Sequence, residues 1–155
     1  KTFIPIAAGG GIKSLKDVCG DIHLKTILEI GELKTYENIK KASVIALCAG
    51  SDFIKTSTGK ISNGSSREAC LVMARTVREF QSYGYGMRGI KVAGGIRSSK
   101  DAIRYLVIIN EELGSSWLSP DYFRFGASSL LDDVLRQIKK LKTNAYQSSY
   151  YFPRG

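Results

Sequence analysis

Three lysines stand within short apolar runs, where a charged side chain is unusual. Lys25 lies in HLKTILE, Lys55 in DFIKTS and Lys91 in GIKVA. Strands of a parallel sheet are normally covered by helices and apolar, and their carboxyl ends face the active site in α/β folds. A lysine placed there beside another cation loses proton affinity through desolvation and like-charge repulsion. Its neutral amine can then attack a carbonyl carbon and form an imine.

An alternative interpretation is that each lysine extends to the surface or pairs with a carboxylate. That interpretation would be preferred for a single lysine. Three lysines in successive apolar runs favour a functional cluster instead, and we expect them to share one site.

Glycines and serines after two of the apolar runs indicate a phosphate site. Gly94 and Gly95 follow the third run, and the segment 126–129 (GASS) follows the fourth. Glycines let a phosphate approach the backbone, and a helix N-terminus offers free N–H groups. The alternative is a tight turn with a serine at the helix N-cap. Taken with the lysines, these segments predict an imine-forming enzyme that acts on a phosphorylated carbonyl compound.

Short β-rich runs alternate with longer helical ones. We expect strands over residues 23–29, 52–57, 89–93 and 122–127, and helices over residues 36–49, 67–83, 100–113 and 130–141. The helices are predicted from apolar residues at 3.6-residue spacing, and the strands from short apolar runs that end in Gly, Ser or Thr. Four consecutive βα units predict a parallel sheet covered by helices.

Two architectures fit this alternation: an open doubly wound sheet and a (β/α)₈ barrel. A barrel needs at least about 200 residues, whereas this chain has 155. It offers four units, or five if residues 2–8 form a strand, so the barrel interpretation describes a partial barrel. We expect a flexible loop at Gly9–Gly11 and a tail over residues 143–155.

Composition limits the classes of partner. The net charge is +9, but the basic residues are spread along the chain, so we do not expect nucleic acid as a partner. No stretch approaches the roughly 20 apolar residues of a membrane span. Three cysteines without CxxC spacing and a single histidine argue against a zinc site. We expect buried thiols at Cys48 and Cys70, as in a reduced cytoplasmic protein.

Four runs of the sequence, in this order, resemble deoxyribose-phosphate aldolases: LKTILEIGEL (24–33), AGSDFIKTSTGK (49–60), KVAGGIRSSKDA (91–102) and FRFGASSLL (123–131). The resemblance covers residues 17–141, and FIKTSTGK is its most specific motif. It implies a class I aldolase on a TIM-barrel fold. Such an enzyme interconverts 2-deoxy-D-ribose 5-phosphate with glyceraldehyde 3-phosphate and acetaldehyde in deoxyribonucleoside catabolism, without a metal or cofactor.

The resemblance also implies a role for individual residues. Lys55 would form the Schiff base, Lys91 would be the second catalytic lysine, and Lys25 would be an accessory charge. A tail tyrosine that aids proton transfer in some members is matched by Tyr150. The positions that match phosphate-binding residues of the family are Gly59, Lys60, Gly94, Gly95, Arg97, Gly126, Ser128 and Ser129.

The sequence departs from the family in three places. Val92 replaces a frequent proline, and the segment 61–67 differs from the usual loop near the phosphate. The family's catalytic aspartate lies upstream of the match, and residues 1–16 contain no Asp. We therefore divide the chain into a divergent N-terminal segment (1–16), the C-terminal part of an aldolase barrel (17–142) and a tail (143–155).

Two further hypotheses stand beside an aldolase whose site is completed by an N-terminal half. One is a non-catalytic half-barrel that binds a sugar phosphate, whose uncovered edges would make it prone to form homo-oligomers. The other, which is weaker, is a basic module that binds nucleic acid with a steep dependence on salt.

Overall fold

The computed structural model describes residues 5–59, 64–148 and 151–152, with only the backbone given for residues 5–10. Four parallel strands form one sheet in the order β1-β2-β3-β4. The strands are β1 (Lys25–Ile27), β2 (Phe53–Lys55), β3 (Gly89–Ala93) and β4 (Phe123–Gly126). This arrangement is the predicted α/β partial barrel, in which each strand is followed by a helix.

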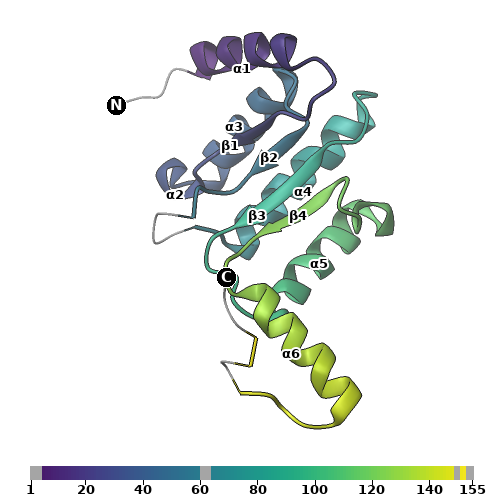
Figure 1. Cartoon of the computed structure of the whole chain (residues 1–155). Helices are drawn as coiled ribbons and strands as arrows, with labels where there is room; N and C mark the ends of the chain where they lie inside the picture. Colours follow the sequence, from purple (N-terminus) through teal and green to yellow (C-terminus); the bar gives the residue numbers. More distant parts are fainter. Residues whose placement is uncertain (1–4, 60–63, 149–150, 153–155) are drawn as a thin grey trace.

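Helices cover one face of the sheet, and the last of them extends away from it (Figure 1). They are α1 (Pro5–Cys19), α2 (Ile30–Leu33), α3 (Tyr36–Cys48), α4 (Arg67–Ser82), α5 (Ser99–Leu113) and α6 (Leu130–Thr143), with the 3₁₀ turn η1 (Ser115–Trp117). The helix α4 packs between α3 and α5, while α1 packs on α3 and α6 on α5. The sheet and helices together therefore form two layers, as expected of βα units.

Alternation along the strands decides which side chains enter the core. Ile54, Ile90 and Val92 are completely buried and join the main apolar cluster with helix residues such as Met73 and Ile109. Successive strand residues point to opposite faces. The neighbours Lys55 and Lys91 therefore point away from the helices, to the face that would be the inside of a barrel.

Serine and threonine side chains set where three of the helices begin. Thr35, Ser66 and Ser98 each accept a hydrogen bond from a backbone N–H in the first turn of α3, α4 and α5. Such N-caps stabilise a helix by about 1 kcal/mol each. Ser129 holds the same position before α6, but its side chain makes no capping bond.

The N-terminal segment differs from what the sequence predicts. Residues 5–8 are helical and so do not form a fifth strand, and Gly9–Gly11 lie inside α1 and not in a loop. Tertiary contacts outweigh the low helix propensity of glycine here. Ile12 packs on the core, and the Lys16 ammonium lies 2.8 Å from the Asp52 carboxylate. The predicted boundaries at residues 16 and 142 stay predictions.

The two cysteines that the sequence predicts to be buried differ in exposure. Cys70 is buried as expected, and burial raises the pKa of its thiol to about 12. Cys48 is exposed, so the prediction of a buried thiol there is wrong. It is the last residue of α3 and follows the buried Leu47, so its side chain lies on the outer side of the helix.

Candidate functional site

Three cations form a row across the open face of the sheet. Lys55 of β2 pairs in register with Lys91 of β3, which pairs in turn with Arg124 of β4. Lys25 lies on the same face, because it stands two residues before Ile27, the partner of Lys55. The structure thus brings the three sequence-predicted lysines to one face of the sheet.

The ring of Phe53 lies beneath this row. It is 1% exposed, and its centroid is 5.1 Å from the Lys25 Nζ and 4.5 Å from the Arg124 Cζ. Gly89 makes room for the ring, since a Cβ there would lie 2.2 Å from a Phe53 ring carbon. The aromatic face attracts both cations and gives the cluster an apolar base.

The cations act on one another. Burial and then the positive charge of Lys91 lower the pKa of Lys55, against an opposing effect of the Glu29 carboxylate. Burial, followed by the charges of Lys91, Arg124 and Lys55, lowers the pKa of Lys25. A lowered pKa increases the fraction of neutral amine, which is the form that attacks a carbonyl.

Two buried hydroxyls fix the strand ends beside the lysines. The Thr56 hydroxyl donates to the Ala93 carbonyl at 3.0 Å and accepts from the Ala93 N–H at 2.9 Å. The Ser57 hydroxyl donates to the same carbonyl at 2.8 Å and accepts from the Gly59 N–H at 3.1 Å. These bonds hold the turn after Lys55 against the end of β3.

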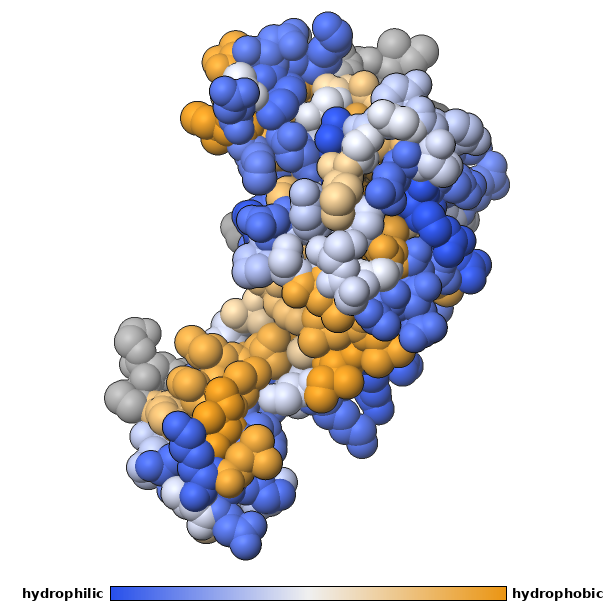
Figure 2. Space-filling view, turned by 90° about the vertical axis from the view of Figure 1, so that its right-hand side faces the viewer, coloured by the Kyte–Doolittle hydropathy of each residue, from blue (hydrophilic) through white to orange (hydrophobic). Residues whose placement is uncertain are grey.

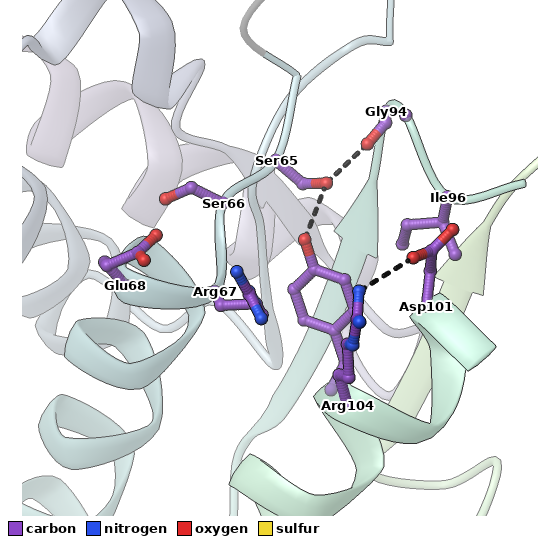
Figure 3. A pocket seen from close by; sticks show the side chains of 10 residues that line it. Ser65, Ser66, Arg67, Glu68, Gly94, Ile96, Asp101 and Arg104 are labelled. Carbon is purple, nitrogen blue, oxygen red and sulfur yellow. Dashed lines mark hydrogen bonds and ion pairs between the residues drawn. The ribbon is translucent and has the colours of Figure 1, made fainter.

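The Gly94-Gly95 turn requires its glycines. Both have positive φ, +99° and +78°, and a Cβ on Gly94 would lie 2.6 Å from the Gly64 Cα. The Ser65 hydroxyl donates to the Gly94 carbonyl and lies 3.2 Å from the Tyr105 hydroxyl (Figure 3). The turn is therefore held from behind by a polar chain that starts on α5.

A pocket of about 350 Å³ lies on that side of the turn, between the first turns of α4 and α5. Arg67 and Arg104 extend along it, but so do Glu68 and Asp101, and Asp101 is 3.3 Å from Arg104 (Figure 3). The mixed charge makes it a weaker anion site than the face that carries the lysines.

The structure places the remaining predicted residues around the carboxyl ends of the strands. Gly126 ends β4, and a Cβ there would lie 2.9 Å from the Lys91 Cε. Ser128 and Ser129 precede α6, and Arg97 is exposed between the Gly94-Gly95 turn and α5. Lys60 and Tyr150 lie outside the described residues.

Sequence reasoning missed Arg124 and Phe53. Arg124 stands within an apolar run, YFRFGA, so the criterion applied to the lysines would have found it. Phe53 carries no such signal, because its role depends on the room left by Gly89 on the next strand.

The described residues hold neither a metal-binding cluster nor a membrane-spanning helix. Within residues 5–59, 64–148 and 151–152, no three His, Cys, Asp or Glu side chains gather in a way that could hold a metal ion. Over the same part of the chain, no helix is both long and apolar enough to cross a bilayer.

Residues 10–136 match the model of the DeoC/LacD family of aldolases. The deoxyribose-phosphate aldolases of Homo sapiens and Mus musculus are 48% and 46% identical to the chain over 142 residues. Each alignment covers 92% of this chain and 45% of the relative, so the chain spans less than half the length of these curated relatives.

Solved structures agree with the sequence matches. A Toxoplasma gondii protein assigned as a deoxyribose-phosphate aldolase matches with a TM-score of 0.73 and 25% identity, over 85% of this chain and 50% of that one. A Coccidioides immitis protein with the same assignment matches with a TM-score of 0.68 and 27% identity. The match covers 84% of this chain and 45% of that one.

Proposed function

The chain belongs to the DeoC/LacD family of aldolases, and on that basis we propose that it carries the Schiff-base half of a deoxyribose-phosphate aldolase site. The reaction would be the reversible cleavage of 2-deoxy-D-ribose 5-phosphate to glyceraldehyde 3-phosphate and acetaldehyde. The observation that carries the proposal is the register pairing of Lys55 with Lys91 on the open face.

The proposed chemistry begins at Lys55. Its neutral amine adds to the C1 aldehyde of the open-chain sugar, and loss of water gives a protonated imine. The C3 hydroxyl then loses its proton, the C2–C3 bond breaks, and its electron pair moves into the imine to give an enamine. Glyceraldehyde 3-phosphate leaves at this point. Protonation of the enamine at C2 and hydrolysis release acetaldehyde and restore the amine.

The phosphate would lie at the turns after β2, β3 and β4. Gly59, Gly94 and Gly95 have positive φ and expose backbone there. The start of α6, where the Ser129 side chain makes no capping bond, adds backbone N–H groups and the dipole of a 14-residue helix. We place Lys60, Arg97, Ser128 and Ser129 around the same group, in keeping with their matched positions in the family.

Proton transfer at the C3 hydroxyl and at C2 needs an acid–base group. The resemblance places the family's aspartate on a strand that precedes the matched residues, so we propose that turnover requires a further segment that completes the barrel. We expect the complete site to work in the cytoplasm, in the catabolism of deoxyribonucleosides.

A second candidate function is a half-barrel that binds a sugar phosphate without cleaving it. It is favoured by the sheet, whose β1 and β4 are both edge strands. Apolar side chains also gather over α6 and the adjoining α5 (Figure 2), where Val107, Leu131 and Leu141 are exposed. Such surfaces favour association, so we expect homo-oligomers of the isolated chain.

Borohydride reduction tests the proposal. The chain is incubated with deoxyribose 5-phosphate, any imine is reduced with borohydride, and the mass of the intact protein is measured by mass spectrometry. A Lys55→Arg variant serves as the control. A covalent sugar adduct that inorganic phosphate competes away is expected, and deoxyribose without phosphate should react more weakly. Absence of an adduct at saturating substrate would contradict the proposal. Because the proposed turnover requires a further segment, the second candidate would be selected by an adduct that releases no acetaldehyde even when the upstream half of a related aldolase is added.

A further inference from the structure

Glu29 has an unusual backbone between β1 and α2. Its φ of 50° and ψ of 64° are left-handed, a conformation that is unfavourable for a residue other than glycine. Both neighbours are held by Lys55 and the residue that follows it. The Leu28 N–H donates to the Lys55 carbonyl at 2.8 Å, and the Ile30 N–H donates to the Thr56 carbonyl at 2.9 Å. The kink at Glu29 is thus fixed from both sides.

The side chain of Glu29 extends to the turn that follows Lys55. Its two carboxylate oxygens lie 3.3 and 3.1 Å from the Thr58 backbone nitrogen and accept its N–H. Glu29 is half-buried, whereas Thr58 is exposed. One carboxylate therefore joins the segment after β1 to the turn that follows Lys55.

The carboxylate also acts on the Lys55 amine. Among the groups that change the pKa of Lys55, burial and Lys91 lower it, and Glu29 is the one that raises it. Lys25 of β1 is a further cation of the cluster, and the charge of Lys55 contributes to lowering its pKa. Glu29 is accordingly the negative charge that the described residues supply to an otherwise cationic cluster.

We propose that Glu29 is the positioning residue of the Lys55 site, holding the Thr58–Gly59 turn and providing the charge that stabilises the protonated imine on Lys55. The imine part of this inference rests on the proposed function. Neutral Lys55 is needed for attack, but the imine that precedes cleavage of the C2–C3 bond is positively charged at that nitrogen. A nearby carboxylate favours the charged intermediate, and the neighbouring cations favour the neutral amine.

The matched variants are Glu29→Gln and Glu32→Gln. The first removes the charge but keeps an oxygen that can accept the Thr58 N–H. The second removes the same charge from an exposed position on α2, three residues away. Glu29→Asp keeps the charge on a shorter side chain and serves as the conservative variant.

The first measurement follows acetylation of Lys55 by acetic anhydride as a function of pH, by peptide mass spectrometry. It reports the amine pKa and needs no substrate. Glu29→Gln should move the midpoint to lower pH by several tenths of a pH unit, because the charge that raises the pKa is gone. Glu32→Gln should leave it in place, and Glu29→Asp should restore most of it. An unchanged midpoint in Glu29→Gln, or an equal change in Glu32→Gln, would overturn the inference.

The second measurement is the fraction of Lys55 reduced by borohydride at saturating deoxyribose 5-phosphate. We expect Glu29→Gln to lower this fraction roughly threefold to tenfold and Glu32→Gln to leave it unchanged. If Glu29→Gln lowers the acetylation midpoint but leaves the fraction of reduced Lys55 unchanged, the proposal that Glu29 stabilises the imine is wrong. If Glu29→Gln lowers the acetylation midpoint but no variant forms an adduct, the result counts against the proposed function. The effect of Glu29 on the Lys55 pKa would still stand.

Discussion

Lys55 and Lys91 are register partners on adjacent parallel strands, and two residues earlier Phe53 and Gly89 are register partners on the same face. The missing side chain of Gly89 admits the Phe53 ring, which lies between Lys25 and Arg124. The ring therefore gives this face of the sheet an apolar base beside the two register-paired lysines. Desolvation and like charge act together there on the pKa of Lys55.

Lys91→Leu should slow imine formation at neutral pH. The positive charge of Lys91 lowers the pKa of Lys55, so its removal raises that pKa and reduces the neutral fraction of the amine. The acid limb of the pH profile of borohydride trapping should move to higher pH, and the rate at pH 7 should fall about tenfold if the Lys55 pKa rises by about one. Lys100→Leu, at an exposed position on α5, is the control. A Lys91→Leu profile that matches the unmodified chain would contradict the paired-lysine account.

Gly126→Ala should displace the Lys91 side chain. The new Cβ would lie 2.9 Å from the Lys91 Cε and 2.8 Å from the Ala93 Cβ. We expect trapping to fall several-fold and the free energy of unfolding to fall by about 1–3 kcal/mol. Gly11→Ala is the control, because nothing lies within 4 Å of its Cβ. That helical position should gain about 0.5–1 kcal/mol and trap normally. Normal trapping by Gly126→Ala would show that Lys91 has room to move.

Ser65→Ala should weaken binding of the phosphate and not the imine chemistry. It frees the Gly94 carbonyl and with it the Gly94-Gly95 turn. The half-saturating concentration of deoxyribose 5-phosphate in trapping should rise about threefold to tenfold, with the adduct at saturation unchanged. Tyr105→Phe, which leaves the Ser65–Gly94 bond in place, should cost only about 0.5–1.5 kcal/mol of stability. Equal effects of the two variants on half-saturation would argue against a role for the turn.

Asp52→Asn should remove an acid-dependent part of the stability. Burial raises the pKa of Asp52, but hydrogen bonds from Lys16 and the Leu24 N–H and the Lys16 charge together lower it below the usual 3.8. A lowered carboxyl pKa stabilises the fold above the unfolded pKa, and this stabilisation is lost as pH falls through the folded one. Urea titrations at pH 7 should show a loss of about 2 kcal/mol in the variant. The difference should shrink below pH 4, and a constant difference from pH 7 to pH 3 would contradict the assignment.

Much of the layout follows from local pattern. Helical periodicity locates α3 to α6, since apolar residues recur in each at 3.6-residue spacing. Lysines in apolar runs locate the cluster, because strand alternation fixes the face on which Lys55 and Lys91 lie. These inferences need only the neighbouring residues in the sequence.

The rest depends on contacts between distant segments. Gly9–Gly11 favour a loop on propensity, yet they are helical because α1 docks on α3. The left-handed Glu29 has no local signal, and its kink is held by hydrogen bonds from Leu28 and Ile30 to β2 and the residue after it. The place of Phe53 depends likewise on a glycine on the next strand.

The most direct test of the central claim is the location of the reduced sugar adduct. After incubation with deoxyribose 5-phosphate and borohydride, the protein is digested and the modified lysine identified by peptide mass spectrometry. We predict that the adduct lies on Lys55, and that Lys91 and Lys25 stay unmodified at substrate concentrations that saturate Lys55. An adduct mainly on Lys91, or spread evenly over the three lysines, would contradict the assignment of Lys55 as the imine-forming residue.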